Sequence, residues 1–249
     1  MKPIAKNKIK TLHGTFEYAL SVKGSPAVIL INGGGGPIEG WHKIFHELAK
    51  EFTILAYNRL GVGKSDKPTG PQHGTAVVTS LKQLLDDIEL PPPYLLVGHS
   101  LGGLYANLFA RYFPDQIAGV VLLEASHPLD LAINDTQPAL IRNLNRFLGI
   151  FDALSPSKKW DEVHFVKETA TQIEQAGPFP DKPLFVVSGT NKPPLMPKHA
   201  LEIRSKNQLD LVQLSKHGKQ VLATRSGHFP QFSEPDLVIQ TIRDCIHST

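Results

Sequence analysis

Hydrophobic residues recur along the chain in short runs, and each run is followed by a turn or by an amphipathic segment. A run of about five apolar residues without polar interruption is typical of a strand that is covered on both faces of a parallel sheet. Residues 9–23 alternate loosely around Gly14 instead, which predicts an edge hairpin. The predicted central strands are residues 27–31, 53–57, 94–97, 119–124 and 183–187, with a shorter strand at 220–223.

Between these strands, apolar residues recur every three or four positions, which predicts helices that pack one face against a sheet. Strands that alternate with helices at short spacing favour an α/β fold: a doubly wound, mostly parallel sheet with helices on both faces. The predicted helices are residues 41–52, 77–88, 104–113 and 198–215, and a last helix that begins at Ser233.

The alternation of strands and helices stops between residues 126 and 181. Two amphipathic helices are expected there, the second of which begins after Ser155. Helices inserted after a strand predict a small helical lid, residues 127–181, over the carboxyl edge of the sheet. We expect one domain over residues 1–249, because the sequence shows no internal repeat and no low-complexity tract. The lid side chains that could face an apolar pocket are Leu140, Leu144, Phe147 and Trp160.

The composition is that of an ordinary globular protein, with 41% hydrophobic and 20% charged residues. The net charge of +3, with no basic cluster interleaved with aromatic residues, argues against nucleic acid as a partner. The single cysteine, Cys245, excludes an internal disulfide and a cysteine metal cluster, and no zinc-type ligand spacing occurs. We therefore expect no cofactor and no metal. The first eight residues lack the apolar core of a signal peptide, and the longest apolar runs are too short to cross a membrane, so a cytoplasmic protein is expected.

The chemically most informative stretch is residues 94–103, in which Gly98, Ser100 and Gly102 form a Gly-x-Ser-x-Gly pattern. It joins a predicted buried strand to a helical run that ends before Pro114. Strand, tight turn and helix in this order form a nucleophile elbow, where small residues let the backbone double back and expose the serine above the strand. Ser100 is therefore the candidate nucleophile, and the alternative is a turn serine that caps a helix.

With these residues the chain resembles the α/β-hydrolase family, and the resemblance extends over nearly all of it. The sequence Gly-His-Ser-Leu-Gly-Gly at residues 98–103 is the form that the elbow takes in many esterases and lipases of the family. The resemblance implies an α/β-hydrolase fold and a serine hydrolase activity. In an open α/β sheet, ligands bind at the carboxyl ends of the strands. Reactive or glycine-rich residues follow predicted strands at 32–36, 100, 124, 189–192 and 226–229.

The candidate general base is His228, because a serine hydroxyl needs a base within hydrogen-bond distance. His228 follows the last predicted strand, and the family keeps its histidine in that loop, in surroundings similar to Gly-His-Phe-Pro-Gln. The alternative is a loop histidine without a catalytic role. His99 is expected to point to the opposite side of its strand and to have a packing role. His127 lies near the site and could contact a substrate.

The third residue of the family's catalytic triad is an acid, and here the chain departs from the commonest family pattern. That pattern places an aspartate after the seventh strand. Residues 188–193 contain no carboxylate, and the neutral Asn191 cannot stabilise an imidazolium. In a serine protease triad, replacing the negatively charged aspartate by the neutral asparagine lowers kcat by roughly four orders of magnitude. Glu124 ends the sixth strand, a location that some branches of the family, including haloalkane dehalogenases, use for the acid, and it is our predicted acid. The alternative is a glutamate that holds the first lid loop, with Asp210 or no acid completing the site.

The oxyanion hole needs two backbone N–H donors at about 3 Å from the developing charge. One candidate is Leu101, which begins the helix behind the serine. By resemblance to the family's His-Gly-x pattern, Asn32-Gly33-Gly34 nominates Gly34 as the second, with Gly35 next to it. The alternative for a run of four glycines is a flexible loop.

Residues 58–65 end in Gly-Lys-Ser, as a phosphate-binding loop does, but Asn58 stands where that motif needs a glycine. The segment is instead similar to the family's turn after the fourth strand, usually Asp-x-Arg-Gly-x-Gly-x-Ser, from which Leu60 departs. Arg59 is expected to anchor neighbouring loops.

These observations together predict a serine hydrolase that cleaves small-molecule carboxylic esters through an acyl-enzyme intermediate. Serine at the elbow, rather than aspartate, argues against the dehalogenase and epoxide hydrolase branches. Two alternatives remain open. The same triad serves carbon–carbon bond hydrolases, hydroxynitrile lyases and aminopeptidases of the family, and a non-catalytic small-molecule receptor could retain the fold.

Overall fold

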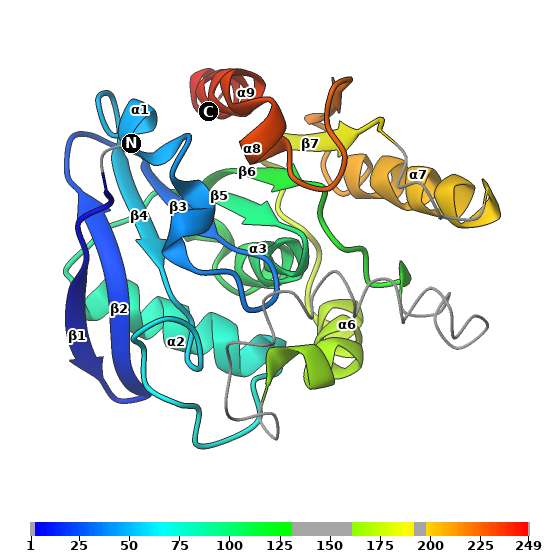
Figure 1. Ribbon diagram of the computed structural model, residues 1–249. Helices are drawn as coiled ribbons and strands as arrows, with labels where there is room; N and C mark the ends of the chain where they lie inside the picture. The colour runs from blue at the N-terminus through cyan, green and yellow to red at the C-terminus, as the bar shows by residue number, and fades with distance from the viewer. Residues whose placement is uncertain (1–2, 131–160, 192–197, 249) are drawn as a thin grey trace.

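The computed structural model describes residues 3–130, 161–191 and 198–248 of the chain. Its centre is an eight-stranded sheet with the strand order β1-β2-β4-β3-β5-β6-β7-β8 (Figure 1). β2 pairs antiparallel with both β1 and β4, and all other neighbouring strands are parallel. The strands are β1 (Asn7–Thr11), β2 (Gly14–Ser21), β3 (Ala27–Ile31), β4 (Thr53–Tyr57), β5 (Tyr94–His99), β6 (Ile117–Leu123), β7 (Leu184–Gly189) and β8 (Gly218–Ala223).

Helices cover both faces of this sheet. α2, α3 and α6 pack on one face, and η1, α1 and α9 pack on the other. Side chains alternate between the faces along each strand: Ile29 belongs to the first core, and its neighbours Val28 and Leu30 belong to the second. The prediction of a doubly wound, mostly parallel sheet is confirmed. The helices are η1 (Ile38–Trp41), α1 (Phe45–Leu48), α2 (Gly74–Asp87), α3 (Leu101–Tyr112), η2 (Pro114–Gln116), η4 (Glu162–Phe165), α6 (Val166–Gln175), α7 (Lys198–Val212), α8 (Pro230–Ser233) and α9 (Pro235–His247).

Three details differ from the sequence prediction. The segment predicted as one helix over 41–52 is a 3₁₀ turn, η1, followed by the four-residue α1. The hydrophobic spacing is still satisfied, because Trp41, Ile44 and Leu48 are all fully buried, and short turns can bury the same face as one longer helix. Of the predicted hairpin, only β1 lies at the sheet edge. Val22 is 73% exposed because β2 ends at Ser21.

The predicted lid, residues 127–181, lies largely outside the described residues, and so do Leu140, Leu144, Phe147 and Trp160. The part that is described contains η4 and α6. α6 packs against α2 and α3, with Ile173 in the first core. η4 contributes Glu162, which is buried.

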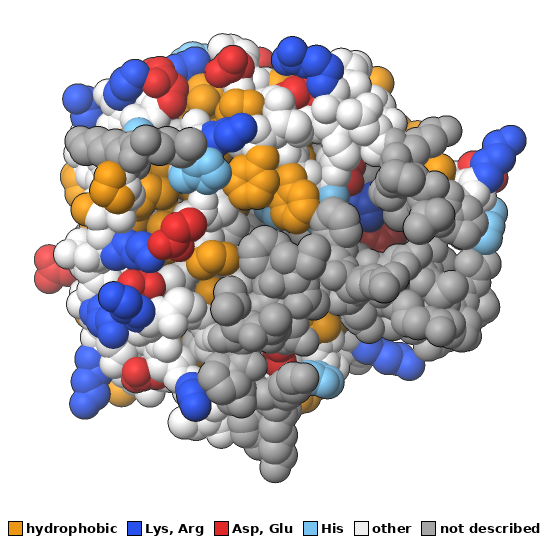
Figure 2. All heavy atoms as spheres, in the orientation of Figure 1, with side chains coloured by type: hydrophobic (Ala, Val, Ile, Leu, Met, Phe, Trp, Pro, Cys, Tyr) orange, Lys and Arg blue, Asp and Glu red, His pale blue; other side chains and the backbone are white. Residues whose placement is uncertain are grey.

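The surface is polar and mixed in charge on the described part of the face in Figure 2, where basic and acidic side chains are interspersed. Hydrophobic side chains gather in the upper half of this face. Within the described ranges, every helix falls short of the length and apolarity needed to cross a bilayer.

Candidate active site

Ser100 occupies a sharp turn between β5 and α3. Its backbone has φ of +50° and ψ of −122°, an uncommon and strained conformation for a residue other than glycine. The turn holds this conformation because its glycines permit close backbone contacts. A Cβ atom on Gly102 would lie 2.2 Å from the carbonyl oxygen of Ile31 and 2.4 Å from that of Asn32. The strain thus presents the Ser100 hydroxyl at the carboxyl edge of the sheet.

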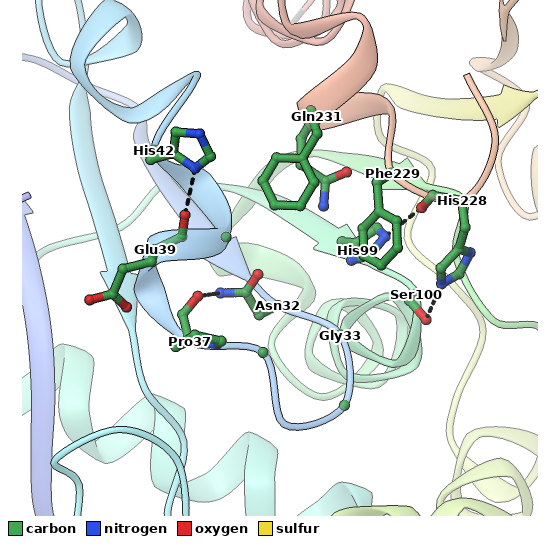
Figure 3. A pocket seen from close by; sticks show the side chains of 14 residues that line it. Asn32, Gly33, Pro37, Glu39, His42, His99, Ser100, His228, Phe229 and Gln231 are labelled. Carbon is green, nitrogen blue, oxygen red and sulfur yellow. Dashed lines mark hydrogen bonds between the residues drawn. The ribbon is translucent and has the colours of Figure 1, made fainter. Parts of the chain in front are cut away.

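His228 comes from the loop between β8 and α8, and its Nε2 lies 3.0 Å from the Ser100 Oγ (Figure 3). The structure therefore brings together the predicted nucleophile and base, 128 residues apart in sequence. The loop is tied down next to the histidine, because Glu234 accepts hydrogen bonds from the N–H of Arg225 and the hydroxyl of Ser226.

His99 has a more specific role than the packing role expected from the sequence. Its Nε2 lies 2.7 Å from the backbone carbonyl oxygen of His228, and the two rings lie 5.0 Å apart. Burial lowers the pKa of His99 to about 3, so the ring is neutral and its Nε2–H donates to that carbonyl. His99 thereby holds the backbone of His228 in place.

Glu124 lies directly after β6, is buried, and has a positive φ of +44°. Its Oε1 accepts the N–H of Gly189 at 2.7 Å, and its Oε2 lies 3.6 Å from Nδ1 of His228. The same Oε2 also lies 2.5 Å from Nη2 of Arg204, an α7 residue that is itself 3.4 Å from the His228 Nδ1. The carboxylate predicted as the acid is therefore shared between an imidazole and a guanidinium.

The other residues considered for the acid position and for substrate contact pair with each other. Asp210 lies 2.9 Å from Nε2 of His127, and Nδ1 of His127 accepts the N–H of Leu129. The sequence left Asp210 open as the acid and His127 open as a substrate contact. In the structure the two side chains bind one another, between α7 and the loop after β6.

The charges around His228 favour the protonation states that a base mechanism needs. Burial opposes ionisation of Glu124, but His228 and Arg204 outweigh it and lower the pKa of this carboxyl to about 2. Burial, together with the charge of Arg204, lowers the pKa of His228, although Glu124 acts in the opposite direction. At neutral pH the pair therefore consists of a carboxylate and a neutral imidazole that can accept a proton.

Gly34 lies in the loop between β3 and η1, and Arg59 sets the orientation of that loop. Arg59 is buried and donates to the carbonyl oxygens of Asn32, at 2.8 Å, and Gly33, at 2.5 Å. In a trans peptide the C=O and N–H groups point in opposite directions. Because the C=O of Gly33 points to Arg59, the N–H of Gly34 points away from it, and Gly34 lines the same pocket as Ser100.

Glu162 of η4 completes this buried cluster. It pairs with the Arg59 guanidinium, with 2.7 Å between Nη2 and Oε1, and Oε1 also accepts the N–H of Gly35 at 2.8 Å. Gly35, the second candidate for the oxyanion hole, is thus engaged elsewhere. Leu101 is the first residue of α3, and the first N–H groups of a helix have no acceptor within it.

A pocket of about 320 Å³ opens at Ser100 and His228, between the loop after β3 and α8 (Figure 3). Phe229 and Phe232 stack with their ring centres 5.6 Å apart on the α8 side. Among the described residues, no group of three or more His, Cys, Asp or Glu side chains is arranged to hold a metal ion. The pocket thus joins a candidate nucleophile, a candidate base and candidate oxyanion donors to a mostly apolar cavity.

Comparison with known families agrees with this arrangement. A model of the alpha/beta hydrolase fold family matches residues 26–158. The chain belongs to the α/β-hydrolase fold family. Solved structures of this family extend the likeness to the whole sheet. Alpha/beta hydrolase domain-containing protein 10 from mouse has a TM-score of 0.73 at 19% identity, covering 98% of each chain. The enol-lactonase from Burkholderia xenovorans has a TM-score of 0.71 at 18% identity, covering 97% of this chain and 100% of the other.

Similar sequences include two bacterial proteins whose names give no activity and a mammalian lipase. An uncharacterized protein of Mycobacterium tuberculosis, Rv2715, is 35% identical over 119 residues, which are 47% of this chain and 34% of that protein. YqjL of Bacillus subtilis is 32% identical over half of each chain. The human (lyso)-N-acylphosphatidylethanolamine lipase is 27% identical over 46% of this chain and 34% of its own. The matches thus span between a third and a half of the length of these relatives.

Sequence reasoning missed Arg204 and Glu162. Neither lies in a recognisable motif, and each contacts its partner across a long stretch of chain: 80 residues from Arg204 to Glu124, and 103 residues from Arg59 to Glu162. For Glu162 the sequence offered one signal, because the expected anchoring role of Arg59 requires a partner. The sequence does not show which residue that partner is.

Proposed function

We propose that this α/β-hydrolase is a serine hydrolase that cleaves small carboxylic esters through an acyl-enzyme intermediate. The observation that carries this proposal is the 3.0 Å contact between the Ser100 Oγ and the His228 Nε2, on a serine that has a strained backbone and lines the pocket. The named activities of structural neighbours, among them an enol-lactonase and a thermophilic esterase from Thermogutta terrifontis, support an ester or lactone as substrate class.

In the proposed first half-reaction, the Ser100 Oγ attacks the ester carbonyl carbon while Nε2 of His228 takes the hydroxyl proton. The carbonyl oxygen becomes an oxyanion, which accepts hydrogen bonds from the N–H groups of Gly34 and Leu101. The bond to the alcohol oxygen then breaks as His228 returns its proton to that oxygen. The products are a free alcohol and an acylated Ser100.

In the second half-reaction, His228 takes a proton from a water molecule that attacks the acyl carbon. The bond to the Ser100 oxygen breaks, that oxygen recovers the proton from His228, and the carboxylic acid leaves. Glu124 balances the positive charge that His228 carries in both steps. Arg204 holds the Glu124 carboxylate in place, and its own positive charge opposes that of the imidazolium.

The decisive experiment compares the wild type with Ser100→Ala on short-chain 4-nitrophenyl esters. We expect the variant to lose about four orders of magnitude or more in kcat, because the nucleophile is absent. An organophosphonate should form one covalent adduct, located at Ser100 by mass spectrometry, and none in the variant. A wild type that neither reacts with the phosphonate nor hydrolyses any ester would overturn the proposal.

The same assay separates the ester reaction from the other reactions of this triad. Matched amides, cyanohydrins and β-diketones are offered to the wild-type protein alongside the esters. We expect the highest kcat/KM for esters, because an alcohol or phenol oxygen is a better leaving group than an amide nitrogen or an enolate carbon, and because a cyanohydrin has no acyl carbonyl for Ser100 to attack. A preference for any of the other three would assign the triad to that reaction instead.

A further inference from the structure

The pocket at Ser100 contains a buried polar side chain that the proposed reaction does not use. Gln231 belongs to α8 and is 2% exposed. Its carboxamide oxygen has no hydrogen-bond partner among the described residues. Figure 3 shows the carboxamide directed from α8 into the pocket. Buried polar groups in native proteins are nearly always hydrogen-bonded. Five buried side-chain atoms of the described residues lack a partner, and Gln231 alone among these five residues lines the pocket at Ser100, which favours a ligand as the missing partner.

The rest of the described lining favours a neutral ligand. Phe229, Phe232 and Pro37 provide apolar walls. The one carboxylate in the described lining, Glu39, is 58% exposed and pairs with Lys6. No lysine or arginine appears in the part of the lining that the structure describes. A ligand charge would therefore lose its hydration without gaining a buried partner of opposite sign.

The three histidines of the lining do not change this conclusion. His99 is neutral and donates to the carbonyl oxygen of His228. The ring of His228 itself lies with its Nε2 against the Ser100 hydroxyl. The His42 Nδ1 lies 2.9 Å from the carbonyl oxygen of Glu39, at the outer end of the pocket. Asn32, the other buried carboxamide of the lining, donates its Nδ2–H to the carbonyl oxygen of Pro37 at 2.7 Å, whereas the carboxamide oxygen of Gln231 has no partner among the described residues.

The pocket has the size of a small-molecule site. Its volume of about 320 Å³ lies at the lower end of the range of about 300–1,000 Å³ that is typical of ligand pockets. One arm of a small ester, either its acyl chain or its alcohol, fits a pocket of this size.

We propose that this pocket binds one short arm of the substrate, apolar along its length and carrying a neutral hydrogen-bonding group such as an amide, and that Gln231 recognises that group. The proposal rests on the proposed function, because attack by Ser100 is what places the arm in the pocket. A carboxamide both donates and accepts, so it pairs reciprocally with an amide. A site built to hydrogen-bond a substrate group discriminates strongly against the analogue that lacks it.

The test uses Gln231→Leu, which removes the carboxamide at similar volume, and two pairs of isosteric esters. The first pair varies the acyl arm: 4-nitrophenyl 6-amino-6-oxohexanoate against 4-nitrophenyl 6-methylheptanoate. The second pair varies the alcohol: 2-carbamoylethyl acetate against 3-methylbutyl acetate. We expect Gln231→Leu to lower kcat/KM for the carbamoyl ester of one pair about tenfold or more, with its alkyl partner unchanged within about twofold. The responding pair identifies which arm occupies the pocket.

Thermal unfolding separates recognition from a structural role. Replacing an unpaired buried amide by leucine should leave Tm unchanged or raise it, whereas loss of a structural hydrogen bond would lower it. Gln213→Leu, at an exposed position after α7, is the matched control and should change neither kcat/KM nor Tm.

The outcomes distinguish this proposal from the proposed function. If the wild type hydrolyses the alkyl esters and Gln231→Leu shows no selective loss in either pair, the role of Gln231 is overturned and the esterase proposal stands. An equal loss on all four esters with a lower Tm would make Gln231 a structural residue. If the wild type hydrolyses none of the four and Ser100 does not react with a phosphonate, both proposals fail.

Discussion

The two sides of the candidate active site are built in different ways. On the nucleophile side, the elbow of residues 98–103 is held by backbone contacts, because Gly102 packs directly on the carbonyl oxygens at the end of β3. The acid side is held together by charged side chains from three elements. Glu124 follows β6, Arg204 belongs to α7, and His228 lies in the loop after β8.

This difference has physical consequences. The elbow depends on the absence of side-chain atoms, so any added atom disturbs its geometry while the charges stay the same. The acid side depends on the balance of one negative and up to two positive charges around the Oε2 of Glu124, so a change of charge alters its chemistry while the backbone stays the same. We therefore expect substitutions of the elbow glycines to act on stability and substitutions on the acid side to act on rate and pH dependence.

Among the substitutions that test this comparison, the largest effect is expected for Glu124→Gln. The glutamine leaves the imidazolium without a counter-charge beside a remaining guanidinium, so kcat on a 4-nitrophenyl ester should fall by about two to four orders of magnitude. Circular dichroism should show an unchanged fold. Glu174→Gln, at an exposed position on α6, is the control and should retain full activity. A loss of less than about tenfold would move the acid role to another residue.

A smaller effect is expected for Gly102→Ala, which should lower the free energy of unfolding and leave the charges of the site unchanged. Its Cβ would lie 2.2 Å from the carbonyl oxygen of Ile31, and overpacking of this kind lowers the free energy of unfolding by about 1–3 kcal/mol or more. Urea denaturation followed by fluorescence measures the loss. Gly177→Ala, where nothing lies within 4 Å of an added Cβ, should stay within about 0.5 kcal/mol of the wild type. Equal stabilities of the two variants would contradict the packing account of the elbow.

The smallest effect is expected for Arg204→Gln, in the pH profile of kcat/KM. His228 acts as a base only when neutral, so activity is full above the pKa of His228 in the folded protein and falls as the pH drops through it. The charge of Arg204 helps to lower that pKa. Its removal should raise the pKa and move the acid limb to higher pH, with a severalfold loss of relative activity at mildly acid pH and little change in the alkaline range.

Arg204→Lys is the matched variant for this profile, because it keeps the charge while changing the shape of the side chain. We expect its acid limb to stay near that of the wild type. If the limb does not move in Arg204→Gln, then Arg204 holds the Glu124 carboxylate without affecting the protonation of His228.

The parts of the fold and site that were predictable from the sequence are those encoded by neighbouring residues. Unbroken apolar runs located the central strands, and the glycines around Ser100 located the elbow. The absence of a carboxylate in residues 188–193 directed the search to Glu124, which the structure places 3.6 Å from His228. The predicted helix over 41–52 was wrong in its extent, because apolar spacing determines which side chains are buried but not how many turns stay helical.

The tertiary structure alone decided which distant side chains meet. Arg204 shares the carboxylate of Glu124, Glu162 pairs with Arg59 behind the Gly34 loop, and Gln231 enters the pocket without a partner among the described residues. No local pattern marks these residues, because an arginine or a glutamine on a helix has the same sequence context whether it faces water or a buried charge. Which of the two it faces depends on the packing of α7, η4 and α8 against the carboxyl edge of the sheet. The sequence thus determined the strands and the candidate nucleophile, and the packing of the chain determined the electrostatics and the shape of the pocket.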